Sequence, residues 1–264
     1  IELVFGNILA DKLDESYFGA FVQYPNVKGE IEDYKNVAEQ LHSANGHLVV
    51  GADLLSLAVI KEPSTFGADV VIGTTQRFGV PIGYGGPHAA FLATTEGFKR
   101  NIPGRIIGVS KDNEGRPALR MALQTREQHI KRERATSNIC TAQALLAVMA
   151  SMYAVYHGAS GIKEIATDIS KRTKSLANGL IKLGFEVETK NYFDTIAVKV
   201  ENKKSLKSKA ESSEINFYYG LDGVVLISLN ETTRNKHVQD ILNVFGKVHI
   251  EPSNFTGFNA GLTR

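Results

Sequence analysis

Short apolar runs alternate with amphipathic segments along the first half of the chain. An amphipathic stretch at 31–46, ending at Gly46, predicts a helix. Runs rich in Val, Ile, Phe and Ala predict four strands, at 19–25, 47–53, 67–75 and 87–95. Because these runs scarcely alternate with polar residues, we expect strands that are covered on both faces. The first half therefore predicts consecutive strand–helix units around a mostly parallel sheet.

The most apolar segment runs from Ile139 to Tyr156 and approaches the roughly 20 residues that span a bilayer. It contains polar side chains and many small ones, so we interpret it as a buried helix of a soluble protein. Ser137 or Asn138 can cap its start, and Gly158 can end it. We therefore expect no membrane contact.

A different pattern follows Gly158. It predicts an amphipathic helix, two strands, a polar helix, a hairpin around Asp222-Gly223 and a last helix, at 161–184, 185–190, 194–200, 204–212, 215–229 and 232–245. Strands mixed with helices on this scale are typical of a small α+β domain. The sequence thus predicts a large α/β domain at 1–158, a small α+β domain at 159–247, and a linker or tail at 248–264.

Composition narrows the function. The chain has 264 residues, and its net charge of +2 comes from 30 basic and 28 acidic residues, so no global field draws it to nucleic acid or lipid. The basic run at 125–138 is interrupted by Glu127 and Glu133 and has no aromatic platform, which argues against RNA. Cys140 is the single cysteine, so no internal disulfide can form, and its apolar neighbours favour a packed residue over a nucleophile.

Candidate chemistry lies where two predicted strands end. Asp53 follows one strand, and Thr74, Thr75, Gln76 and Arg77 follow the next. In an open α/β sheet, ligands bind beyond the carboxyl ends of the strands. An aspartate there, beside a strand end that presents a lysine, is typical of a pyridoxal phosphate site. The alternative is that Asp53 only caps the following helix.

Two further stretches allow a functional and a structural interpretation. The glycine-rich loop of Gly83, Gly85 and Gly86 resembles a phosphate cradle, but no GxxxxGK[ST] motif is present and His88 takes the place of the last glycine of GxGxxG. A tight turn is therefore the better interpretation. The hydroxyl and amide groups at 134–138 precede a helix, where they could bind phosphate or simply cap it.

Taken together, these stretches resemble the P-protein of the glycine cleavage system, glycine dehydrogenase (decarboxylating). The resemblance rests on long blocks in the family's order and spacing: "FGAFVQYP", "QRFGVPIGYGGPHAAF", "PGRIIGV", "RMALQTREQHIKRERATSNICTAQALLA", "YHGASGI" and "GLDGVVLISLNET". The resemblance implies fold type I of the pyridoxal phosphate enzymes. Residues 1–158 then form the C-terminal part of a large domain.

P-proteins carry two related halves, and this chain resembles the N-terminal half, which lacks the lysine. Setting Pro81 and the Gly85-Gly86-Pro87 run against the catalytic half places Thr75 at its histidine and Gln76 at its Schiff-base lysine. An amide nitrogen cannot form that imine. The resemblance therefore implies a vestigial cofactor site of Asp53, Thr75 and Gln76, with no catalytic residue and no cofactor on this chain.

The resemblance also implies partners. The other half would bind pyridoxal phosphate, decarboxylate glycine and pass an aminomethyl group to lipoylated H-protein, in a dimeric assembly. Fold-type-I partners lend residues to each other's sites, which implies that some side chains of this chain face the catalytic half: Arg126, His129, Thr136, Ser137 and Asn138. In aminotransferases an arginine precedes an Ile-Ser pair of the small domain, where this chain has Leu226.

Three readings of function remain open. The first is the non-catalytic half of glycine dehydrogenase, inactive in isolation. The second is a structural dimerisation module with no part in catalysis, and the third is a free-standing pyridoxal enzyme that uses another lysine. The start of the chain shows no signal peptide, so targeting was either removed or never present. We expect the bacterial cytoplasm, with the mitochondrial matrix as the alternative. We expect no metal site.

Overall fold

The computed structural model describes residues 1–102, 105–123, 128–135, 143–258 and 261–264. A four-stranded sheet in the order β1-β2-β3-β4 forms the centre of the large domain, with strands Gly19–Tyr24, His47–Ala52, Val70–Thr74 and Ala90–Thr94. The first three strands are parallel, and β4 is antiparallel to β3. The predicted strands and the mostly parallel fold class are confirmed. The reversed edge strand shows that the sheet is mixed.

One face of this sheet carries the core of the large domain. Helix α1 (Lys35–Ser43) packs there, together with the short 3₁₀ helices η1 (Ser56–Ala58) and η2 (Pro63–Phe66). Tyr24 is fully buried and meets Tyr34 and Phe66 edge to face, with ring centroids 6.3 and 5.4 Å away. Aromatic side chains bury large apolar areas and prefer this geometry.

The opposite face of the sheet is open in the part of the chain that the structure describes. Phe21, Ile72 and Leu92 point to that face and are exposed. The ring of Phe21 lies over Gly51, where a Cβ would meet it at 3.0 Å. The prediction that both faces are covered is therefore wrong for the described residues, because the non-alternating runs show only that both faces are apolar.

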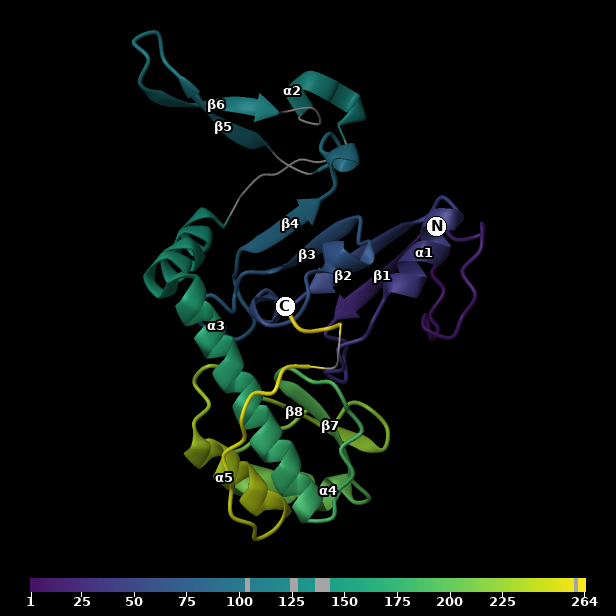
Figure 1. Cartoon of the computed structure of the whole chain (residues 1–264), viewed down its shortest axis with the longest axis vertical. Helices are drawn as coiled ribbons and strands as arrows, with labels where there is room; N and C mark the ends of the chain where they lie inside the picture. The colour runs from purple at the N-terminus through teal and green to yellow at the C-terminus, as the bar shows by residue number, and fades with distance from the viewer. Residues whose placement is uncertain (103–104, 124–127, 136–142, 259–260) are drawn as a thin grey trace.

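A β-hairpin projects beyond the sheet (Figure 1). It pairs β5 (Ile106–Lys111) with β6 (Pro117–Leu123) in antiparallel fashion, and η3 (Glu96–Phe98) precedes it. The short helices α2 (Gln128–Lys131) and η4 (Arg132–Arg134) follow. The hairpin was absent from the sequence predictions, and most of its apolar side chains are exposed.

Helix α3 (Ala144–Lys182) runs past the edge of the sheet and down to the small domain (Figure 1). It kinks at Gly158, whose φ of 62° and ψ of 178° are not helical. Its first half is largely exposed, including Leu145, Met152 and Tyr156, so the prediction of a buried helix is wrong for the described residues. Among them, α3 is the one helix long and apolar enough to cross a membrane, a test that packed helices also pass.

The small domain lies around the second half of α3. Strands β7 (Thr195–Lys199) and β8 (Val224–Ser228) pair antiparallel, and helices α4 (Lys203–Ser212) and α5 (Asn235–Phe245) pack with α3 around one apolar cluster. The predicted strand at 185–190 is only a bridge between Val187 and Val198. The predicted hairpin likewise contributes one strand, β8, and a single bridge between Tyr218 and Leu226.

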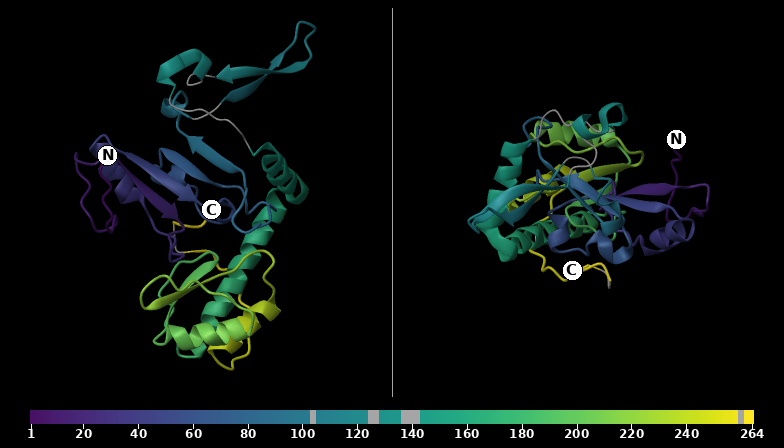
Figure 2. Two further views of the ribbon diagram at one scale, coloured as in Figure 1. Left: turned by 180° about the vertical axis from the view of Figure 1, so that it is seen from behind. Right: turned by 90° about the horizontal axis from the view of Figure 1, so that it is seen from above.

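The tail at 248–264 returns from the small domain to the sheet, as the two views of Figure 2 show. Its described residues form no helix or strand, yet Phe255, Phe258 and Leu262 pack against the core of the large domain. The backbone N–H of Lys61 donates to the carbonyl of Leu262 at 2.9 Å. The tail thus contacts both domains.

Candidate functional site

Asp53 lies at the carboxyl end of β2. Its backbone N–H donates to the carbonyl oxygen of Tyr24 at 3.0 Å and so continues the sheet by one residue. Its Oδ1 accepts the backbone N–H groups of Leu55 and Ser56 at 2.8 and 3.1 Å. These bonds satisfy donors in the turn that leads into η1, in the way that aspartate stabilises a helix start. Oδ2 is left for a different partner.

That partner is Arg77, which follows β3 by three residues. Its Nη1 lies 3.1 Å from Oδ2 of Asp53 and 2.6 Å from Oδ2 of Asp194. The guanidinium also lies over the ring of Phe193, 5.8 Å from the centroid. The guanidinium of Arg77 therefore pairs with two carboxylates, and it lies where the two predicted domains meet.

Burial governs the electrostatics of this triad of Asp53, Arg77 and Asp194. Asp194 is only 8% exposed, and desolvation raises its pKa although Arg77 acts in the opposite direction. Its Oδ1 accepts a hydrogen bond from the Thr195 hydroxyl at 2.9 Å. Burial alone would lower the pKa of Arg77, but Asp53 and Asp194 outweigh it, and the net pKa lies above its ordinary value. The guanidinium is therefore charged.

Gln76 lies beside this triad, and its amide has no acidic or basic neighbour among the hydrogen-bond partners described. Its backbone N–H donates to Oγ1 of Thr74 at 3.0 Å, and its Nε2 lies 3.5 Å from the carbonyl oxygen of Ile82. The N–H and the hydroxyl of Thr75 both donate to the carbonyl of Ala89, which directly precedes β4, at 2.9 and 3.1 Å. Both side chains therefore serve local structure.

The glycine-rich loop stands exposed beyond these strand ends. Gly83, Gly85 and Gly86 all have positive φ, between 50° and 141°, which favours glycine. Tyr84 also has positive φ and is fully exposed, and His88 is exposed as well. The backbone N–H groups of Gly85 and Gly86 both donate to the carbonyl of Ile82, at 3.0 and 3.1 Å, so the loop closes as a tight turn.

An aromatic cluster connects the strand ends to α3. The ring of Tyr153 stacks on Phe78 with centroids 5.5 Å apart and lies 4.4 Å from the His157 ring. Its hydroxyl donates a short hydrogen bond to Glu231, and burial together with this bond raises the pKa of Tyr153. Gly79, at φ 75°, lies so close that a Cβ there would meet the Tyr153 ring at 2.6 Å.

The residues of this site do not fit pyridoxal phosphate. A Schiff base needs a primary amine, and Gln76 offers an amide. The ring nitrogen of the cofactor needs a carboxylate, but both oxygens of Asp53 are engaged, by two backbone N–H groups and by Arg77. In the described part of the chain, no group of three or more His, Cys, Asp and Glu side chains could hold a metal ion.

The residues predicted to face the other half fall mostly outside the description. Arg126, Thr136, Ser137 and Asn138 lie outside the described residues, and His129 lies in α2. Their role in an interface stays a prediction. Leu226 is buried in β8, where it carries no charge toward the strand ends.

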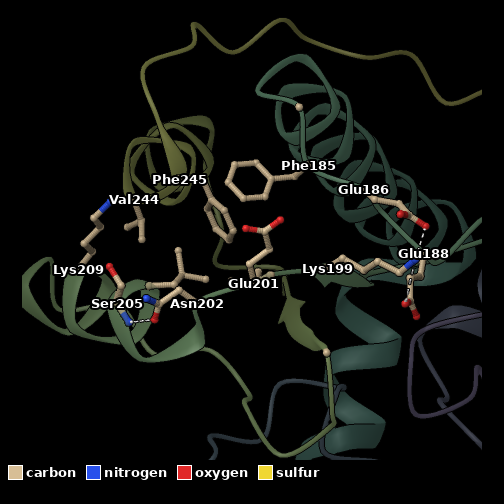
Figure 3. Close-up of a pocket in the computed structure, with 14 residues that line it drawn as sticks. Phe185, Glu186, Glu188, Lys199, Glu201, Asn202, Ser205, Lys209, Val244 and Phe245 are labelled. Atoms are coloured by element: carbon tan, nitrogen blue, oxygen red, sulfur yellow. Dashed lines mark hydrogen bonds and ion pairs between the residues drawn. The ribbon is translucent and has the colours of Figure 1, made fainter.

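The small domain carries a separate hollow of about 700 Å³. Phe185 and Phe245 meet edge to face in it, with centroids 5.1 Å apart, and Glu201 lies between these rings and Lys199 (Figure 3). Lys199 pairs with Glu186 at 2.7 Å. This hollow contains none of the predicted site residues.

Two residues of the triad, Asp53 and Arg77, were predicted from the sequence, and the third, Asp194, was not. Asp53 and Arg77 were expected at neighbouring strand ends, because each directly follows an apolar run. Asp194 has no comparable signal, since the contact joins residues 117 positions apart in the chain. Glu231, the partner of Tyr153, is 78 positions away and gives no signal in local patterns either.

Comparison with known proteins gives consistent results. The chain is 54% identical over 248 residues to glycine dehydrogenase (decarboxylating) of Christiangramia forsetii, covering 94% of this chain and 26% of that protein. It is 50% identical over 239 residues to the protein of the same name from Paraburkholderia xenovorans, covering 90% of this chain and 24% of that one. The chain thus spans about a quarter of the length of these curated relatives.

Solved structures agree. A crystal structure of glycine decarboxylase (P-protein) in inhibitor-bound form superposes with a TM-score of 0.82 at 31% identity, covering 89% of this chain and 56% of that chain. A NifS-like protein, at 18% identity and a TM-score of 0.58, shares the fold alone. The model of the family described as glycine cleavage system P-protein matches residues 1–245. The chain therefore belongs to the P-protein family of the glycine cleavage system, with the fold-type-I architecture.

Proposed function

We propose that this chain is part of the N-terminal, lysine-less half of glycine dehydrogenase (decarboxylating). One observation carries the proposal: the strand end where a Schiff-base lysine is expected holds Gln76, and the neighbouring Arg77 already occupies Asp53. This half then supplies shape and surface, and the other half supplies the reacting groups. The substrate of the whole enzyme is glycine, and its acceptor is the lipoyl group of H-protein.

Pyridoxal phosphate is held by the catalytic half in this proposal, where it supplies an electron sink for decarboxylation. The task of this chain is to present a fixed surface to that half. The first half of α3 offers such a surface, with exposed apolar side chains at helical spacing: Leu145, Val148, Met149, Met152, Val155 and Tyr156. Apolar patches of this kind mark interaction sites.

Whether any lysine of this chain forms an imine with pyridoxal phosphate tests the proposal directly. Pyridoxal phosphate is added to the purified chain, an absorbance spectrum is recorded, and borohydride reduction with peptide mapping locates any trapped imine. We expect no stoichiometric adduct, because position 76 has no amine. A single stoichiometric adduct at one buried lysine would instead identify a free-standing pyridoxal enzyme and overturn the proposal.

Ser137 and Asn138 provide a second test in the assembled enzyme. We propose that they hold the partner's phosphate group across the interface. The S137A/N138A double variant should weaken cofactor binding about tenfold or more, because hydrogen bonds to a charged group contribute about 1.5–3 kcal/mol each. Unchanged affinity and turnover would remove this role.

The second candidate function is a dimerisation module without catalytic influence. The exposed apolar side chains on the first half of α3, called the α3 stripe below, favour association under both candidate functions. Association alone therefore does not distinguish the two functions. Substitutions in the glycine-rich loop, such as Tyr84→Ala, do separate them, because the Tyr84 side chain is fully exposed in the structure. The enzyme proposal predicts a lower kcat for glycine decarboxylation with assembly intact, whereas the dimerisation module predicts no change in kcat.

We place the protein in the bacterial cytoplasm, with the mitochondrial matrix as the alternative.

A further inference from the structure

The triad joins two domains through a buried ionic contact. Arg77 belongs to the sheet of the large domain, and Asp194 directly precedes β7 of the small domain. The Nη1–Oδ2 distance of 2.6 Å is at the short end for a charge-assisted hydrogen bond. Lys28 and Glu188 form another ion pair across the domains, 2.9 Å apart, but the Lys28 side chain is 48% exposed. Solvent weakens that pair far more than it weakens the triad.

Both carboxylates of the triad are anchored. Asp53 is tied to its turn by two backbone N–H groups. The backbone of Asp194 accepts the N–H of Leu229, and its side chain accepts the hydroxyl of Thr195, which in turn contacts the Ser228 hydroxyl at 2.8 Å. Asp53 lies in the same domain as Arg77 and moves with it, but Asp194 is fixed in the small domain and cannot follow the guanidinium if the domains separate. Opening therefore breaks the contact.

Opening also leaves charge uncompensated. The single guanidinium balances two carboxylates, with Glu231 close enough to contribute, and its Nη2 is buried without a hydrogen-bond partner. A buried charge that loses its partner is strongly unfavourable. We propose that Arg77 is an ionic latch that holds the small domain against the sheet of the large domain. The proposal rests on this geometry and does not depend on the catalytic role of either half.

A second attachment between the domains reports whether the latch is closed. The backbone N–H groups of Lys190 and Asn191 donate to the Glu30 carboxylate at 2.7 and 2.8 Å, and the N–H of Ile31 donates to the carbonyl of Asn191 at 2.8 Å. None of these groups contacts Arg77 among the contacts described. Their amide exchange therefore measures domain separation and not a local effect of substitution.

Hydrogen exchange with mass spectrometry on the longest natural form of the protein tests the latch. In R77M we expect the amides of Ile31, Lys190 and Asn191 to exchange about tenfold faster or more, which corresponds to about 1.4 kcal/mol. The matched control is R172M, because Arg172 pairs with Asp168 within α3 at 3.7 Å and joins no domains. The control should stay within about threefold of the parent.

Two more conservative variants, D194N and R77K, test the latch if R77M does not fold. D194N retains the Arg77–Asp53 pair and removes the negative charge from the contact across the domains, so the same three amides should exchange faster. R77K keeps the charge without the planar fork and should lie between the parent and D194N. Parent-like exchange of these amides in D194N, or equal acceleration in R172M, would overturn the latch.

Discussion

Single side chains at the ends of β2 and β3 determine what this site can do. The Gln76 amide removes the possibility of an imine, and Arg77 takes the carboxylate that a pyridoxal ring would need. Asp53 has kept a structural task, since its Oδ1 closes the turn into η1. An aspartate at this place therefore says little about cofactor binding until its partners are known.

Removal of Arg77 should make stability depend on pH. In R77M, Asp53 and Asp194 face each other with Glu231 and Tyr153 nearby and no cation between them. The folded-state pKa of Asp194, already raised by burial, rises further above the ordinary value of about 3.9. The added stability of the protonated form is complete below that ordinary value and is lost as pH rises through the folded pKa.

We therefore expect R77M to lower the free energy of unfolding by about 3–5 kcal/mol at pH 7, and by clearly less near pH 4.5. Urea unfolding of the variant and its parent at both values measures the difference. The R77M/D194N double variant is the control, because it removes one of the two uncompensated carboxylates and should flatten the pH dependence. An equal loss at both pH values would contradict the electrostatic explanation.

Helix α3 shows how far an element can be predicted. Its apolarity was recognised from the sequence, but the same composition suits a helix buried in its own chain and one covered by a partner. Only the contacts distinguish them, and in the described part of the chain Val148 and Met152 stay more than half exposed. The strands β1–β4 were easier to predict because apolar runs between turn residues mark them directly. The hairpin β5–β6 was missed because its exposed residues follow neither the strand nor the helix pattern.

Charges on the α3 stripe should affect association and not folding. Val148 and Met152 are 55% and 59% exposed, so V148E/M152E should change the stability of this chain by only about 0.5 kcal/mol. In the assembly each side chain would lose about 1.5–3 kcal/mol of apolar burial, which corresponds to about a hundredfold weaker association or more. Analytical ultracentrifugation with the catalytic half measures this.

Lys163→Glu is the matched control, because Lys163 is an exposed residue on the same helix beyond the kink. It changes charge without touching the stripe and should leave association unchanged. If V148E/M152E leaves the affinity for the catalytic half unchanged, or if the control lowers this affinity equally, the stripe is not the docking surface.

At the scale of the whole molecule, the arrangement of the two domains was beyond sequence reasoning. The long contacts that fix it, between Arg77 and Asp194 and between Glu30 and Asn191, join segments more than a hundred residues apart. No local period encodes such a pairing, because it depends on how completed domains meet. The tail illustrates the same point, since residues without any periodicity pack on the large domain through Phe255 and Phe258.

Gly29 offers the sharpest probe of how the domains meet. Its φ is 84°, and a Cβ there would lie 2.0 Å from the carbonyl oxygen of Thr195, the residue after Asp194. Gly29→Ala therefore combines backbone strain with a clash against main chain of the other domain, and should cost about 2–4 kcal/mol of unfolding free energy. Gly184→Ala is the control, because Gly184 has nearly the same φ, 88°, and open space around its Cβ. It should cost only about 1–2 kcal/mol. Because main chain cannot yield as a flexible side chain does, G29A should also speed the exchange of the Lys190 and Asn191 amides. Equal losses in the two variants, with unchanged exchange, would mean that the domains meet less closely in solution than this contact requires.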